Sequence, residues 1–212
     1  MKRTIVVAVA LAFVLLSAGA AFAGIAGSKH DMRTWLTDEA VGEGYDEVCV
    51  YCHTPHSASS AAQLWNRTGV AIGSYMVYTS STMNATPGQP GAGSQLCLSC
   101  HDGTIAVNNL VNPPNNAPSG APTDYFIANT NAAYMGTDLT NDHPIGLDYG
   151  QSASGDAGLI PIGTVTTAGT VRLISGTQVE CASCHDAHNA TAVPFLRTSN
   201  VESLLCTACH LK

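Results

Sequence analysis

All eight cysteines of the chain fall into four pairs, each with two residues between the cysteines and a histidine directly after them. The four stretches are CVYCH (49–53), CLSCH (97–101), CASCH (181–185) and CTACH (206–210). C-x-x-C-H is the attachment motif of c-type haem, in which two thiols bond to the porphyrin edge and the adjacent imidazole binds the iron. Disulfides, or zinc, would not require a histidine after every pair. We therefore expect four covalently bound haem c groups, with thioether bonds from Cys49, Cys52, Cys97, Cys100, Cys181, Cys184, Cys206 and Cys209.

The histidines match this haem count. The motifs supply four expected proximal iron ligands, which are His53, His101, His185 and His210. Four histidines remain as expected distal ligands, and these are His30, His56, His143 and His188. The methionines are treated as packing residues, because the histidines already supply one distal ligand for each iron. An iron with two protein ligands has no open position for a substrate, so the pattern predicts an electron-transfer protein and no enzyme.

The first 23 residues read as a secretory signal peptide. They have a basic start, an apolar run too short to span a bilayer, and an Ala-Phe-Ala end that is typical of a cleavage site. Cleavage removes two of the eight basic residues and none of the 15 acidic ones, which takes the formal net charge from −7 to −9. We expect an exported chain with no membrane span in its mature form. Its acidity argues against nucleic acid as a partner.

The mature chain, residues 24–212, is expected to form a single tetrahaem cytochrome c domain built from two loose repeats, 24–110 and 140–212. Each repeat holds a lone histidine, a long motif with an extra histidine, an apolar-basic stretch and a short motif. The corresponding stretches are CVYCHTPH and CASCHDAH, LWNR and FLRT, and CLSCH and CTACH. The extra histidine lies three residues after the proximal one, so on a helical turn both imidazoles share a face and cannot bind the same iron.

The repeat restricts the pairing of ligands to haems, which we number by motif. The lone histidines, His30 and His143, are expected to serve haem 1 and haem 3. In a closed scheme, His56 binds haem 2 and His188 binds haem 4. In an open scheme, His188 binds haem 2, and His56 binds haem 4 of another copy, a head-to-tail contact that builds filaments. The sequence leaves both schemes open.

Large apolar side chains are too sparse for a thick core, so the porphyrins are expected to fill it. We predict a multihaem cytochrome c with low secondary structure, short α-helices and long loops around a stacked haem chain. Residues 163–180 alternate in polarity and contain Gly turns, which predicts a small β-hairpin there.

The sequence segments in and around the motifs resemble those of a known family. They include SKHDM, EVCVYCHTPH, LWNR, QLCLSCHDGT, NDHPIG, VECASCHDAHN and SLLCTACH, in this order across nearly the whole mature chain. The chain resembles the tetrahaem, doubled C-x-x-C-H cytochromes exported by metal-reducing bacteria, and more specifically the OmcE-like nanowire cytochromes. The resemblance implies four bis-histidine haems in one continuous stack, and subunits that polymerise into extracellular filaments with one axial histidine crossing each boundary.

The leading hypothesis is electron transfer through an extracellular conductive filament, with other cytochromes or extracellular metal oxides as redox partners. The filament partner is another copy of the chain, and His56 is the candidate ligand to the neighbouring chain's haem 4. The expected location is extracellular or the cell surface, alternatively the periplasm. The alternatives are a monomeric periplasmic electron shuttle and a multihaem reductase of nitrite, hydroxylamine or a similar small oxidant.

Overall fold

The structure is a computed structural model that describes residues 24–33, 45–69, 74–115, 125–192 and 194–211. The predicted leader, 1–23, lies outside the described residues. Regular structure is scant, as predicted, and the helices are short: α3 (Ala92–His101), α4 (Tyr149–Gly155), α5 (Ile162–Ala168), α6 (Cys181–Cys184) and the 3₁₀ turns η1 (Val201–Ser203) and η2 (Cys206–Ala208). Within these ranges, no helix has the length and apolar character that a membrane crossing requires.

Two minimal sheets join segments that lie far apart in the sequence. Strand β1 (Met76–Val77) pairs in parallel with β2 (Asp138–Leu139). Strand β3 (Leu147–Asp148) pairs antiparallel with β4 (Gln178–Val179). Strands of two residues cannot hold a domain together by themselves, so they act as local fastenings between loops.

The hairpin predicted over 163–180 is wrong in its first half. Residues 162–168 form helix α5 instead, which begins after Pro161 and ends at Gly169 in the left-handed conformation, with φ of 66°. The threonines that suggested alternation are satisfied within the helix: Thr167 Oγ1 donates to the Gly163 carbonyl at 2.7 Å. Strand β4 does form near the end of the segment, but it pairs with β3.

Buried apolar side chains form three small clusters rather than one core. One contains Leu147, Tyr149, Val165, Val171 and Val179; a second contains Tyr51, Val107 and Ile127; the third contains Tyr75, Leu98 and Leu139. The clusters lie beside the C-x-x-C-H motifs, and cysteines of the second and fourth motifs pack against two of them. Such a divided core is what the composition predicts.

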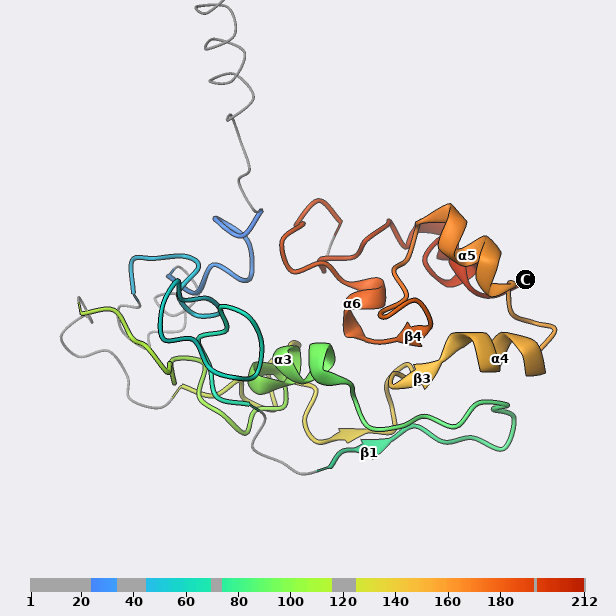
Figure 1. Ribbon diagram of the computed structural model, residues 1–212, viewed down its shortest axis with the longest axis horizontal. Coiled ribbons are helices and arrows are strands. Elements are labelled where there is room, and N and C mark those ends of the chain that lie inside the picture. The colour runs from blue at the N-terminus through green and yellow to red at the C-terminus, as the bar shows by residue number, and fades with distance from the viewer. Residues whose placement is uncertain (1–23, 34–44, 70–73, 116–124, 193, 212) are drawn as a thin grey trace, which may run out of the picture.

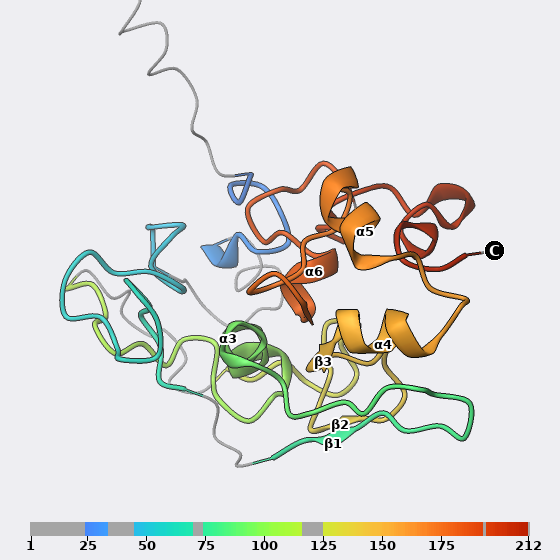
Figure 2. The same cartoon turned by 45° about the vertical axis from the view of Figure 1, so that its right-hand side comes forward.

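Helices α3 and α6 meet at the centre of the molecule (Figures 1 and 2), where α6 lies directly against α3. The second motif ends α3 and the third motif forms α6, so the sequence-distant repeats join at their haem-attachment turns. Both of these helices therefore contain motif residues.

Candidate functional site

The first motif is closed by a hairpin-like contact with residues 64–66. The Thr54 amide donates to the Leu64 carbonyl at 2.9 Å, and the Asn66 amide donates to the Cys52 carbonyl at 2.9 Å. Leu64 adopts a φ of 59°, which turns the returning chain against the motif. The Asn66 side chain donates to the Val50 carbonyl inside the motif at 2.7 Å.

The third motif repeats this arrangement position by position. The Asp186 amide donates to the Phe195 carbonyl at 2.8 Å, and the Arg197 amide donates to the Cys184 carbonyl at 2.8 Å. Phe195 has a φ of 58°, and the Arg197 Nε donates to the Ala182 carbonyl at 2.8 Å. The match between LWNR and FLRT is therefore structural, down to the left-handed residue and the carbonyl that receives the side chain.

The second and third motifs touch through their first cysteines. The thiols of Cys97 and Cys181 share a hydrogen bond, which raises the pKa of Cys97 and lowers that of Cys181 to about 7. The Cys181 amide donates to Ser94 Oγ of α3 at 3.0 Å. All eight cysteines are free thiols, as haem attachment requires.

The fourth motif is held by the segment that follows α4. The Ile160 amide and the Tyr149 hydroxyl both donate to the Cys209 carbonyl, at 2.8 and 3.0 Å. The Leu211 amide donates to the Gly158 carbonyl at 2.8 Å. This motif is therefore anchored from both sides of its second cysteine.

Three pairs of imidazoles face one another, and each joins a motif histidine to a histidine outside the motifs. The ring centroids are 6.0 Å apart for His53 and His188, 6.2 Å for His30 and His101, and 6.3 Å for His143 and His210. An iron bonded to nitrogen at about 2 Å on each side, with the ring centre about 1 Å beyond each nitrogen, needs a separation of roughly 6 Å. The three pairs fit that requirement.

Carbonyl groups lie at the Nδ1 atoms of two of these paired histidines and of His185, and so leave Nε2 for an iron. The distances are 2.7 Å from His101 to Ala133 O, 3.0 Å from His143 to Pro144 O, and 3.0 Å from His185 to Pro194 O. A backbone carbonyl at one ring nitrogen is the usual way in which a metal-binding histidine is oriented.

Burial favours the neutral form of two further histidines. Partial burial lowers the pKa of His30, and the facing His101 adds to the effect. Burial also lowers the pKa of His53, and His188 adds to the effect there. A neutral imidazole is the form that binds a metal.

The pairing differs from both schemes drawn from the sequence. His188 faces His53 of the first motif, whereas the schemes gave it haem 2 or haem 4. The lone histidines face the short motifs of their own repeats rather than the long ones. The physical reason lies in the loop path: the Gly24 amide donates to the His188 carbonyl at 2.8 Å, so the start of the first repeat lies across the loop of the second.

His56 and His185 remain. Among the described residues, no ring contact joins either of them to another histidine. The His56 carbonyl accepts from Thr54 Oγ1 at 2.8 Å and from Asn112 Nδ2 at 3.1 Å, which fixes the loop that presents the exposed imidazole. Residues 53–56 are not helical, because His53 sits in a bridge with Trp65, so the expected shared helical face is absent.

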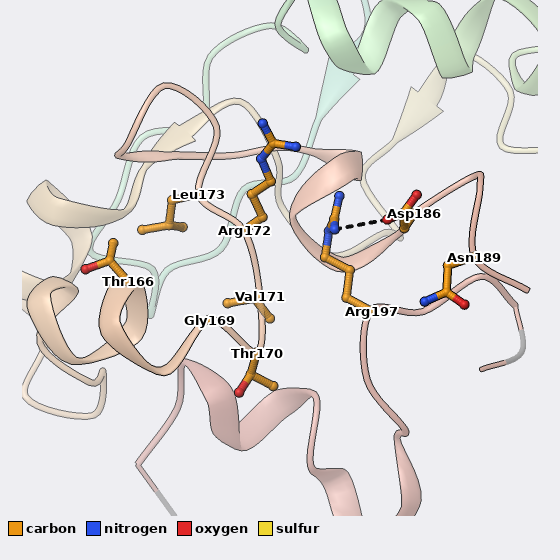
Figure 3. Close-up of a pocket in the computed structure, with 9 residues that line it drawn as sticks. All are labelled: Thr166, Gly169, Thr170, Val171, Arg172, Leu173, Asp186, Asn189 and Arg197. Carbon is orange, nitrogen blue, oxygen red and sulfur yellow. Dashed lines mark hydrogen bonds and ion pairs between the residues drawn. The ribbon is translucent and has the colours of Figure 1, made fainter. Parts of the chain in front are cut away.

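A hollow of about 460 Å³ lies beside the third motif (Figure 3). Arg172 and Arg197 line it with their side chains directed the same way, and Arg197 Nη1 pairs with Asp186 Oδ2 at 3.3 Å. The lining also includes Thr170 and Asn189. These residues could hold an anionic group, such as the propionate of a haem attached at this motif.

One protein family, described as "Doubled CXXCH motif", matches residues 176–212, which contain the third and fourth motifs. No curated protein matches the chain. The doubled motif is the signature of covalent attachment of more than one haem c.

This match and the four C-x-x-C-H motifs support a multihaem c-type cytochrome.

Sequence reasoning missed three buried polar residues of this cytochrome's site: Asn66, Arg67 and Glu180. Each binds inside or directly beside a motif, and each is at most 5% exposed. The only sequence signal was their position next to apolar residues: Asn66 and Arg67 end LWNR, and Glu180 precedes the third motif.

Proposed function

We propose that the chain binds four haem c groups, each iron held between two histidines, and works as an exported electron carrier that assembles head to tail into extracellular filaments. The observation that carries the proposal is the set of three imidazole pairs, at ring separations of 6.0, 6.2 and 6.3 Å. Haem c, when bound, supplies an iron that takes up and releases one electron.

The chain's own residues hold and orient that group. In each motif the two cysteines fix the porphyrin edge while the following histidine binds one side of the iron. The histidine that faces it closes the other side, so a small oxidant finds no position to bind. This supports a carrier rather than a reductase.

The order of the imidazole pairs supports the proposed filament. His53 of the first long motif faces His188, the extra histidine of the following repeat. If His185 of the second long motif is paired in the same way, its partner is the extra histidine of the following repeat, which is His56 of the next copy. The geometry thus favours haem 3 of the neighbour as the group bound by His56. Haem 4 was the sequence-based candidate, but His143 already faces its motif histidine, His210.

Exposed apolar side chains support contact between copies. Leu64 and Val111 are 54% and 44% exposed on the loops beside Thr54 and Asn112, the residues that fix His56. Val201 and Leu204 are 68% and 51% exposed in the segment that follows the third motif's hairpin. Apolar groups at both ends of a non-closing contact are suited to a head-to-tail assembly. Other cytochromes or extracellular metal oxides are the proposed redox partners.

One observation favours a second candidate function. The exposed His185 has no facing imidazole among the described residues of its own chain, so in a monomer its iron would keep an open position. A monomeric reductase of a small oxidant would use that position. A monomeric periplasmic shuttle would have to fill it from within the chain.

The test combines haem counting, microscopy and carbon monoxide binding. We expect four haems per chain by mass and by pyridine haemochrome absorbance, filaments in negative stain, and no carbon monoxide binding by the reduced filament. The variant His56→Met keeps four haems, loses the filaments and binds carbon monoxide at about one quarter of the haem, because one iron in four has lost its partner.

The matched control is His188→Met, which changes an axial ligand inside the chain and leaves assembly intact. Filaments of normal length from His56→Met would refute the intermolecular ligand. Carbon monoxide binding by the intact filament would refute the carrier and favour the reductase.

A further inference from the structure

Two opposite charges are buried where the haem-attachment motifs meet. The Arg67 side chain is 0% exposed and Glu180 is 5% exposed. Among the described residues, neither takes part in an ion pair. A buried charge without a counter-ion is costly to keep, so its presence calls for an explanation.

Arg67 donates only to neutral acceptors. Its Nη2 donates to the Ser99 and Ala106 carbonyls, both at 2.9 Å, its Nε donates to Ser99 Oγ at 3.3 Å, and its Nη1 donates to the Val107 carbonyl. Ser99 lies inside the second motif, so the guanidinium is attached to the turn that would carry haem 2. Carbonyl dipoles stabilise the cation without cancelling its charge.

The same cation acts on the first motif. Its neighbour Asn66 binds Val50 within that motif at 2.7 Å. Asn66 and Arg67 are adjacent in the chain, so the buried cation lies beside the first motif as well as the second. Buried Asp102 directly follows the second motif and carries the opposite charge there. Thr54 stands at the equivalent position after the first motif, so no carboxylate follows that motif directly.

Glu180 occupies the other side of the junction. Both carboxylate oxygens accept from the Gly91 amide at 3.1 Å, one accepts from Ser94 Oγ, and Cys181 of the third motif follows directly. A Cβ at Gly91 would lie 2.5 Å from Glu180 Oε1, so the contact requires glycine there. The anion thus joins the third motif, which forms α6, to the start of α3.

We propose that buried Arg67 and Glu180 set unequal reduction potentials in the two halves of the haem chain, higher at haem 1 and haem 2 and lower at haem 3. Reduction adds one electron to an iron, and a fixed cation nearby stabilises the added charge while an anion opposes it. Neither charge reaches solvent, so screening by water and salt is weak. The reduction potential then falls from the haems of the first repeat to haem 3 across the junction between α3 and α6, so added electrons occupy the first repeat preferentially. This inference rests on the haem binding proposed above.

The test is a spectroelectrochemical titration of the haem-loaded chain, in which the electrode supplies one electron to each iron. Arg67→Gln should lower the highest potential and Glu180→Gln should raise the lowest one, each by a factor of at least about 10 in the reduction equilibrium, or about 59 mV. The control, Lys29→Gln, removes an equal charge from an exposed side chain next to His30 and should shift the potentials less than either.

Haem content is measured first by mass, so that failure of haem binding is separate from failure of this inference. If either neutral variant loses haem, Arg67→Lys and Glu180→Asp keep the charges and should keep the wild-type potentials. Shifts of the same sign in both neutral variants, or shifts no larger than that of Lys29→Gln, would overturn the proposal. The proposal would also be overturned if Arg67→Lys or Glu180→Asp, which keep the charges, shifted a reduction potential by about 59 mV.

Discussion

The Asn66 side chain is a fully buried polar group whose removal should lower the stability of this fold considerably. It is 0% exposed and makes three hydrogen bonds: Nδ2 donates to the carbonyls of Val50 and Asn112, at 2.7 and 3.2 Å, and Oδ1 accepts from the Asn112 amide at 2.9 Å. Asn66→Ala leaves two carbonyls and one amide without this partner. At about 1 kcal/mol for each buried group, the free energy of unfolding should fall by about 3 kcal/mol.

Such a loss is large against the 5–15 kcal/mol or so that stabilises a typical domain. The assay is guanidinium unfolding of the haem-loaded monomer, followed by far-ultraviolet circular dichroism and by haem absorbance. The midpoint should fall without a change in the slope of the free energy with denaturant concentration.

The matched control is Asn131→Ala, which removes one local bond to the Ala133 amide at 2.8 Å in a less buried turn. Its cost should be about 1 kcal/mol or less. If Asn66→Ala costs no more than this control, the buried polar contact between the first motif and residue 112 does not stabilise the fold as argued.

Three other predictions concern local features. Gly103→Ala should destabilise the chain, because Gly103 has a φ of 71° and a Cβ there would lie 2.4 Å from Tyr134 Cε2. Gly93→Ala in α3 places its Cβ in open space and should stabilise the chain by about 0.5–1 kcal/mol. The two variants should therefore shift the melting temperature in opposite directions, and shifts in the same direction would contradict this prediction. Tyr149→Phe should lower the free energy of unfolding in guanidinium by about 1–2 kcal/mol, since the buried hydroxyl donates to two carbonyls at 2.7 and 3.0 Å. An unchanged free energy of unfolding would show that the Tyr149 hydroxyl does not anchor the fourth motif. Asp148 caps α4, and the amide hydrogen bond from the first turn lowers its pKa from 3.8. The ionised Asp148 carboxylate therefore stabilises the fold above pH 3.8, and this stabilisation is lost as the pH falls below that value. Asp148→Asn should melt at a lower temperature than the wild type at pH 7, and the two melting temperatures should converge in acid. A difference in melting temperature that persists at about pH 2 would contradict the role of the charged cap.

The sequence predicted the features that depend on short spacings. The C-x-x-C-H motifs and the scarcity of regular structure follow from residues within a few positions of one another, and the equivalence of LWNR and FLRT follows from a repeated local hairpin. Helix α5 escaped prediction because alternating threonines resemble a strand, while the features that decide the helix are Pro161 at its start and Gly169 at its end.

Contacts across the chain lay beyond the sequence. The sequence alone suggests that Glu180 is a solvent-exposed acid, but the packing of α6 on α3 buries it. The contact between Glu180 and Gly91 is possible because residue 91 has no side chain. The pairing of the histidines could not be predicted for a related reason. Spacing indicates that His185 and His188 cannot share one iron, but the loop path decides which motif histidine lies near His188, and long-range bonds such as the one from Gly24 fix that path.

The two repeats are best understood as successive steps of one chain rather than as halves of a closed domain. His188 of the second repeat reaches back to the long motif of the first, and the filament proposal extends that step to His56 of the next copy. In that proposal the contact between copies differs from the contact within a chain. Val48 precedes the first motif where Glu180 precedes the third, so no carboxylate enters the contact between copies at that position. The proposed contact between copies relies on exposed apolar side chains and the axial imidazole.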